Sequence, residues 1–84
     1  MITGVQIRAA RNALRWTTEQ LAREAGVTSR TIKRFEASDD VPPSRTETLL
    51  TVKVALEAAG IEFVGSPNDR PGIRVSTPSP TAPR

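Results

Sequence analysis

The chain has 84 residues, enough for one small domain, and a domain of this size buries only about 60% of its unfolded surface. It contains no cysteine and no histidine, which excludes disulfides, thiolate zinc sites and catalysis by a histidine base. Twelve basic residues against nine acidic ones give a net charge of +3, which favours a binding module with an anionic partner over an enzyme.

Two helices are predicted in the first third of the chain. The first covers residues 3–14, with Thr3 as its N-cap. The second begins after Thr17, which forms a capping box with Gln20, and it ends at Gly26. Positions with helical spacing are Ile7, Ala10, Arg11, Leu14, Leu21, Ala22 and Ala25.

Two further helices are predicted before residue 60. Thr28 caps the third, over residues 29–37, and Ile32 and Phe35 point inward from it. A segment with two aspartates and two prolines ends this helix. Ser44 with Glu47 predicts a capping box for the fourth helix, which continues to residue 60.

A β-hairpin is predicted after the helices. Residues 61–64 and 73–75 alternate as strands do, and turn-forming residues 65–72 connect them. A hairpin alone is marginal in water, so its apolar face either packs on the fourth helix or joins the hairpin of a second chain. Residues 76–84 contain three prolines and no large apolar side chain, which predicts a disordered tail.

The most informative stretch is residues 18–35. Small Ala22 lies where the second and third helices would cross, Gly26 provides the tight turn, and Ile32 fills the space between the helices and the core. This spacing is typical of a helix-turn-helix.

With this pattern in place, residues 5–60 resemble the Cro and phage-repressor type of helix-turn-helix domain, the XRE family. The resemblance implies a mainly α fold, a compact four-helix repressor-like bundle that binds duplex DNA, commonly as a homodimer. The expected organisation is a DNA-binding domain over residues 1–60, a hairpin over 61–75 that serves as a candidate dimerisation element, and the tail.

The resemblance also implies which residues contact DNA. Ser29, Arg30 and Arg34 would face the bases, Thr28 would lie near a phosphate, and Lys33 would meet the backbone. Arginine suits this role because its guanidinium forms a bidentate pair with guanine. The implied set is Thr18, Thr28, Ser29, Arg30, Lys33 and Arg34.

The chain departs from the family pattern at a few positions. Thr18 stands where a phosphate-contacting glutamine is usual, and Ser38 replaces a common glycine. Asp39 and Asp40 lie where a DNA-facing loop often carries basic residues, and we interpret them as turn formers. We interpret Trp16 as a core residue at the junction of two helices.

Arg11 and Glu36 match positions that form a buried ion pair in the family, so the resemblance assigns Arg11 to the fold and not to DNA. A buried charge is tolerated only when it is paired and hydrogen-bonded.

These observations lead to a functional hypothesis with two alternatives. The hypothesis is a sequence-specific double-stranded DNA-binding transcriptional regulator, a dimeric repressor that recognises an inverted repeat through helix 28–37. The alternatives are the DNA-binding antitoxin of a toxin–antitoxin pair, with a small protein partner, and a protein–protein adaptor that kept the fold. No secretory signal or membrane-length apolar run is visible, so we expect a cytoplasmic chain. Because the chain has no histidine or cysteine, we also expect no enzymatic activity, and we expect no cofactor.

Overall fold

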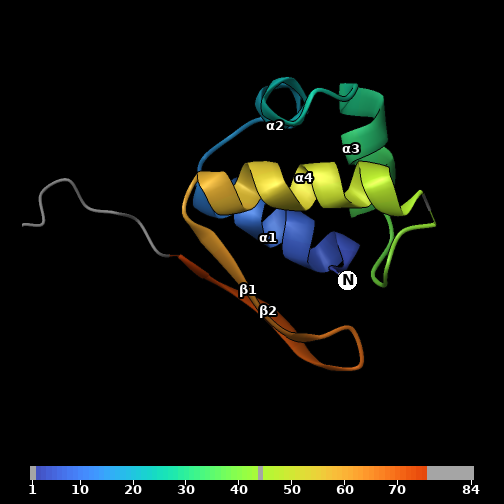
Figure 1. The fold of residues 1–84 in the computed structure, drawn as a ribbon, viewed down its shortest axis with the longest axis vertical. Coiled ribbons are helices and arrows are strands. Elements are labelled where there is room, and N and C mark those ends of the chain that lie inside the picture. The colour runs from blue at the N-terminus through green and yellow to red at the C-terminus, as the bar shows by residue number, and fades with distance from the viewer. Residues whose placement is uncertain (1, 44, 76–84) are drawn as a thin grey trace, which may run out of the picture.

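The computed structural model describes residues 2–43 and 45–75, which form four helices followed by an antiparallel hairpin (Figure 1). The elements are α1 (Gly4–Ala13), α2 (Thr18–Ala25), α3 (Ser29–Glu36), α4 (Thr46–Ala58), β1 (Ile61–Ser66) and β2 (Asp69–Val75). The mainly helical fold with a C-terminal hairpin is therefore confirmed, whereas the predicted tail lies outside the described residues.

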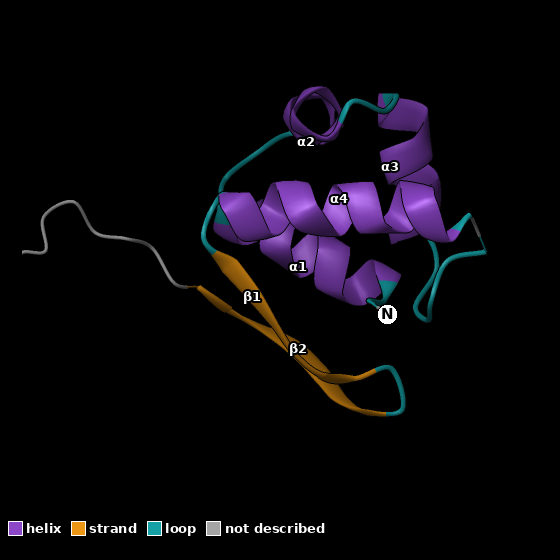
Figure 2. Cartoon of the chain, viewed as in Figure 1, coloured by secondary structure: helices purple, strands orange, loops and turns teal. Residues whose placement is uncertain are grey.

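The helices and the hairpin occupy different sides of the molecule. In Figure 2, α4 crosses in front of α1. The helices α2 and α3 lie above this pair in the view, and the hairpin projects below it.

No helix within residues 2–43 and 45–75 has the length and hydropathy that crossing a bilayer requires.

The first three helices begin at the residues that the sequence predicted. Thr3, Thr17 and Thr28 are the N-caps, and each threonine side chain accepts a hydrogen bond from the amide three residues later. The capping box of Thr17 with Gln20 is confirmed. Gly26 ends α2 with φ 72°, a left-handed conformation that glycine adopts without a Cβ penalty.

The predicted start of α4 is wrong. Arg45 is the N-cap, and its side chain makes no capping hydrogen bond, while its carbonyl accepts the amides of Thr48 and Leu49 at 3.1 and 3.2 Å. A capping box places the N-cap three residues before its acidic partner, and here Glu47 is only two residues after Arg45. Ser44 lies outside the described residues.

A single apolar core joins the four helices to the first residue of β1. The predicted inward residues Ile32 and Phe35 are fully buried in it, and Trp16 packs against it as predicted. The buried apolar residues are Ile2, Ile7, Ala10, Leu21, Ala22, Ala25, Ile32, Phe35, Leu49, Val52, Leu56 and Ile61.

The hairpin is longer than the sequence predicted, because both strands continue into the segment interpreted as a connection. β1 reaches Ser66 and β2 begins at Asp69, with an irregularity in the register between Val64 and Ser66. Gly65 lies at this irregularity with φ 76°, and a Cβ there would meet the Arg70 carbonyl. A bulge at glycine thus lets pairing continue past the predicted end of the strand.

The apolar face of the hairpin packs on its own chain. Ile61 is buried, and Phe63 and Ile73, which are paired across the strands, pack against the core. β1 contacts α4 and β2 contacts α1. The sequence left open whether this face packs on its own helices or on a second hairpin. In the structure, these three side chains pack on their own chain.

Gln6 of α1 links the N-terminal helix to the hairpin. Its Oε1 accepts the Thr3 amide at 2.9 Å, which completes a capping box. Its Nε2 donates to the carbonyls of Val64 at 3.2 Å and Gly72 at 2.9 Å. Gln6 is buried, the bond to Thr3 is buried and the two hairpin bonds are partly buried, so losing the side chain leaves polar backbone groups without their partner.

We therefore expect Gln6→Ala to lower the free energy of unfolding by about 2–4 kcal/mol, because it removes one cap and two hairpin bonds. Gln20→Ala is the matched control, since Gln20 caps α2 in the same way but is exposed, and its capping hydrogen bonds within the described residues are with Thr17 alone. It should cost about 1 kcal/mol or less. Urea unfolding monitored by circular dichroism measures both, and equal losses would show that the hairpin bonds add nothing.

Candidate nucleic-acid interface

The α2–turn–α3 unit is held by short backbone bonds around Gly26. The Gly26 amide donates to the Arg23 carbonyl at 3.3 Å, and the Val27 amide donates to the Ala22 carbonyl at 3.0 Å. Ala22 is buried in the core, and α2 contacts α3 directly. α3 therefore lies across α2, as the helix-turn-helix pattern predicted. Its position depends on the small Ala22, the left-handed Gly26 and the buried Ile32.

The side chains of α3 separate into a buried face and a basic outer face. At about 100° per residue, the buried Ile32, Phe35 and Glu36 lie on one side of the helix. Arg30 lies almost opposite their midpoint, and Lys33 and Arg34 lie to either side of it, all three exposed. Ser29 and Thr31 are half-buried at the margins. The predicted basic contact residues thus share the outward face.

Glu36 is the only acidic residue of α3, and it is bound to α1. Arg11 donates from Nε to Oε2 at 2.7 Å and from Nη2 to Oε1 at 3.0 Å, so the pair is bidentate. Glu36 is 8% exposed, and the Arg11 side chain is 16% exposed. Hydrogen bonding to Glu36 raises the pKa of Arg11, which stays charged. The outward face of α3 therefore carries positive charge only.

Two predicted phosphate contacts lie at helix starts. The Thr28 hydroxyl accepts the Thr31 amide at 3.2 Å and lies 3.0 Å from the Thr31 hydroxyl. Thr18, the first residue of α2, donates its hydroxyl to Glu19 at 3.1 Å. The pKa of Glu19 is lowered by a bond from its own amide, by this hydroxyl and, more weakly, by Lys33. A phosphate at Thr18 would compete with the Glu19 carboxylate.

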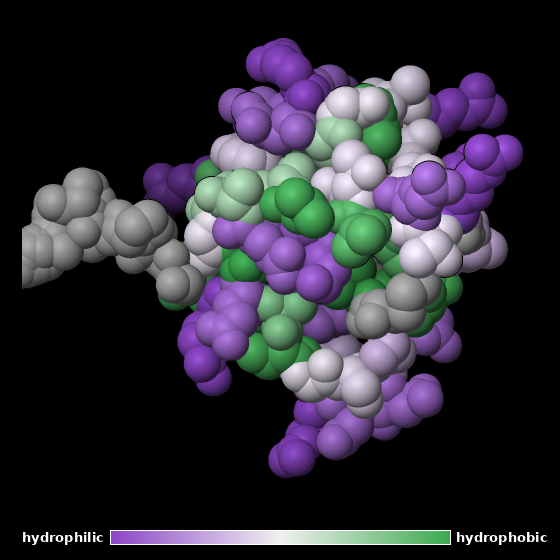
Figure 3. Space-filling model, viewed as in Figure 1, coloured by the Kyte–Doolittle hydropathy of each residue, from purple (hydrophilic) through white to green (hydrophobic). Residues whose placement is uncertain are grey.

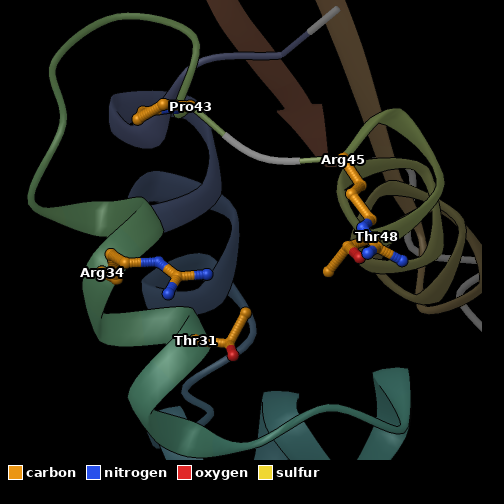
Figure 4. Close-up of a pocket in the computed structure, with 5 residues that line it drawn as sticks. All are labelled: Thr31, Arg34, Pro43, Arg45 and Thr48. Carbon is orange, nitrogen blue, oxygen red and sulfur yellow. The ribbon is translucent and has the colours of Figure 1, made fainter.

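A hollow beside α3 contains residues that the sequence analysis missed. It has a volume of about 560 Å³ and is lined by Thr31, Arg34, Pro43, Arg45 and Thr48 (Figure 4). Arg34 and Thr31 come from α3, and Arg45 and Thr48 come from the start of α4, on the other side of the hollow. The helical spacing of Thr31 and Arg34 was visible in the sequence, but the approach of α4 was not.

The comparison with protein-family models agrees with this geometry. A model described as a helix-turn-helix domain matches residues 3–61, which is most of the chain. The chain belongs to the helix-turn-helix domain family. No curated protein matches it significantly. Membership supports a DNA-binding regulator in general, and domains of this kind typically bind rather than catalyse.

In this helix-turn-helix domain, the acidic loop after α3 acts as a structural connection. The Asp40 carbonyl accepts the Gly4 amide at 3.0 Å, and the Asp40 carboxylate accepts the Val41 amide at 2.9 Å. The Ser38 hydroxyl donates to the same Asp40 carbonyl at 3.3 Å. Asp40 therefore joins the loop to the start of α1, which is consistent with its interpretation as a turn former.

We expect Glu36→Ala to lower the free energy of unfolding by about 3 kcal/mol, because Arg11 would keep its charge in a largely buried position without a carboxylate. Glu57→Ala is the matched control: it breaks the exposed Lys53–Glu57 pair of 2.9 Å on α4 and should cost less than about 0.5 kcal/mol. Thermal unfolding distinguishes the two. An unchanged melting temperature for Glu36→Ala would show that the pair does not stabilise the fold.

Proposed function

We propose that the chain is a sequence-specific transcriptional repressor of the XRE type, which binds double-stranded DNA as a dimer and recognises an inverted repeat with α3 in the major groove. The observation that carries this proposal is the outward face of α3, where Arg30, Lys33 and Arg34 are exposed while Glu36 is buried against Arg11. A helix with a purely cationic face suits a groove lined by phosphates.

Arg30 is the main base-contacting residue in this proposal. It lies at the centre of the outward face, where a guanidinium extends furthest from the core toward the groove floor and can pair with guanine O6 and N7. Ser29 lies at the start of the helix beside it. Thr28 and the first amides of α3 suit a phosphate, because the positive end of the helix dipole lies there.

The proposed dimer needs a surface outside α3. Leu50 and Val54 of α4 are 52% and 54% exposed, and they lie one turn apart on the same helix face. Figure 3 shows apolar side chains over the side of the molecule on which α4 lies in Figure 1. A second copy would cover this face and present a second α3 to the other half-site. Because such a repressor acts on DNA, it would be located in the cytoplasm of a cell that has no nucleus.

The same apolar face supports a second candidate function. Leu50 and Val54 could bind a small protein instead of a second copy, as an antitoxin or an adaptor does. An adaptor would not need a cationic α3, so the absence of DNA binding would distinguish it from the repressor, whereas an antitoxin would bind both DNA and a small protein.

The proposal predicts that log affinity for the DNA upstream of the protein's own coding sequence falls linearly with log salt concentration. Arg30→Ala should weaken binding by about 1–3 kcal/mol and relax preference at one base pair, because a bidentate base contact is lost. Fluorescence anisotropy with a set of single-base-pair variants of the duplex measures both effects.

Arg23→Ala is the control for Arg30→Ala, since Arg23 is an exposed arginine near the end of α2 and outside the α3 face. The DNA affinity and the base-pair preference of the Arg23→Ala variant should match those of the wild type. Wild-type protein without salt-dependent DNA binding would argue against the repressor and in favour of the adaptor.

For the dimer, we expect Leu50→Asp to convert the protein to a folded monomer, because the substituted side chain is exposed in the single chain and a charge would be buried at the dimer interface. Val75→Asp, at the end of β2 and 46% exposed, is the matched control that tests a shared hairpin sheet. Light scattering at micromolar concentration decides between them. If Val75→Asp is a monomer and Leu50→Asp is a dimer, the dimer interface is formed by the hairpin. If the wild type is a monomer, the proposed dimer is wrong.

A further inference from the structure

We propose that the groove between α2 and α4 is a docking site for a basic amphipathic helix of another protein, and that this helix displaces the second copy of the chain from α4. The groove has a volume of about 450 Å³, and α2 contributes Glu24 to its wall. The residues of α4 that line it are Leu50, Thr51, Val54, Ala55 and Ala58. The inference rests on the proposed dimeric repressor and adds a way in which that dimer is regulated.

The dimensions of the groove suit a helix as its occupant. Its lining on α4 extends from Leu50 to Ala58, a rise of about 12 Å along the helix axis. Apolar side chains at positions i, i+4 and i+7 of a partner helix cover about the same length. Ala55 and Ala58 are small, so a partner helix can approach α4 closely.

The apolar centre of this face is not covered by the described part of the chain. Leu50 and Val54 are 52% and 54% exposed, and both line the groove. In Figure 3, hydrophobic residues lie beside hydrophilic ones over the region that α4 occupies in Figure 1. Large apolar side chains that are exposed together and bordered by polar groups are typical of a protein interaction site.

The charged groups of this face are mostly acidic, although the whole chain has a net charge of +3. Glu24 lines the groove, and Glu47 and Glu57 are exposed in the first and last turns of α4, within about 60° of Leu50 around the helix. Lys53 already pairs with Glu57 at 2.9 Å, and it lines a smaller hollow on the other side of Leu50. These four groups together carry a net charge of −2.

This charge favours a basic partner over a second copy. In a symmetric dimer the same face of both copies meets, so the three carboxylates of each copy approach those of the other and repel them. Lysine or arginine side chains that flank the apolar face of a partner helix would instead be attracted to Glu24, Glu47 and Glu57. Arg23 precedes Glu24 but does not line the groove.

Loss of the second copy would weaken repression without any change in α3. None of the residues of α3 lines the groove, so a chain with a partner helix bound there keeps its own cationic face. It lacks the second α3 that the dimer presents to the other half-site, and the two half-sites are no longer bound together. A basic partner thus releases the repressor from an inverted repeat while each domain stays folded.

The first test uses the full chain and two fluorescent helical peptides of about four turns, each with leucine at positions i, i+4 and i+7. The flanking positions are lysine in one peptide and glutamate in the other. Fluorescence anisotropy should show that the lysine peptide binds more tightly, on the order of tenfold, and that the difference decreases at high salt. Light scattering should show that the lysine peptide converts the dimer to a monomer. Equal affinities for the two peptides would overturn the proposal.

Removal of the carboxylates gives a sharper result, because it should change two equilibria in opposite directions. Glu24→Gln combined with Glu47→Gln should weaken binding of the lysine peptide by about fivefold and strengthen the homodimer by a similar factor. Sedimentation equilibrium measures the homodimer, and circular dichroism should confirm that the double variant is folded, since both carboxylates are exposed. A general loss of structure would weaken both complexes.

Asp39→Asn is the matched control, because Asp39 is an exposed acid in the loop after α3 and does not line the groove. It should change neither the peptide affinity nor the homodimer. If the double variant binds the lysine peptide as tightly as the wild type, or if its homodimer is weaker, the carboxylates do not select the occupant and the proposal is overturned.

Further outcomes separate this inference from the alternatives and from the proposed function. If deletion of residues 76–84 raises the affinity for the lysine peptide about tenfold, the groove binds the chain's own C-terminal segment, and the proposal is wrong. If the protein binds DNA as a dimer but the two peptides do not differ, the repressor stands and the docking site is wrong. If the lysine peptide binds in a Glu24-dependent way to a protein without salt-dependent DNA binding, the docking site stands and the proposed function fails.

Discussion

The ion pair between Arg11 and Glu36 is the constraint on which the arrangement of the helices depends. It joins the end of α1 to the end of α3 through two charge-assisted bonds, and Arg11 also donates to the Trp16 carbonyl at 2.9 Å. Arg8 adds a bond to the Glu36 carbonyl. Three separate segments are therefore fixed at one point, and the orientation of α3 relative to α1 follows from it. Because the geometry is bidentate, a shift of α3 along its axis would break both bonds together.

α1 contacts α3, α4 and the hairpin, and it holds α3 and the hairpin through different side chains. Arg11 holds α3, while Gln6 holds the hairpin through the carbonyls of Val64 and Gly72. The hairpin consequently lies on the side of the molecule away from α2 (Figure 1). In a chain this small, the hairpin contributes Ile61 to the core, so it completes the fold rather than forming an independent module.

Local chemistry explains which features could be predicted from the sequence. The caps at Thr3, Thr17 and Thr28 and the turn at Gly26 each depend on residues a few positions apart, and the sequence displays them directly. The predicted start of α4 was wrong because the spacing of a capping box can occur by chance, here directly after two prolines. The Gln6 bonds span 58 and 66 residues, and the hollow needs α4 to approach α3, so no local pattern could have shown either.

A cationic α3 carries a cost to stability that its buried side must offset. Arg30 and Arg34 are four residues apart, so their like charges repel along the helix by a few tenths of a kcal/mol. Arg34 lies 5.9 Å from the Phe35 ring centre, which gives its charge one favourable neighbour while Phe35 itself anchors the core. The residues that hold α3 and those that face outward from it are therefore different, and substitutions on the outward face can change DNA recognition without unfolding the domain.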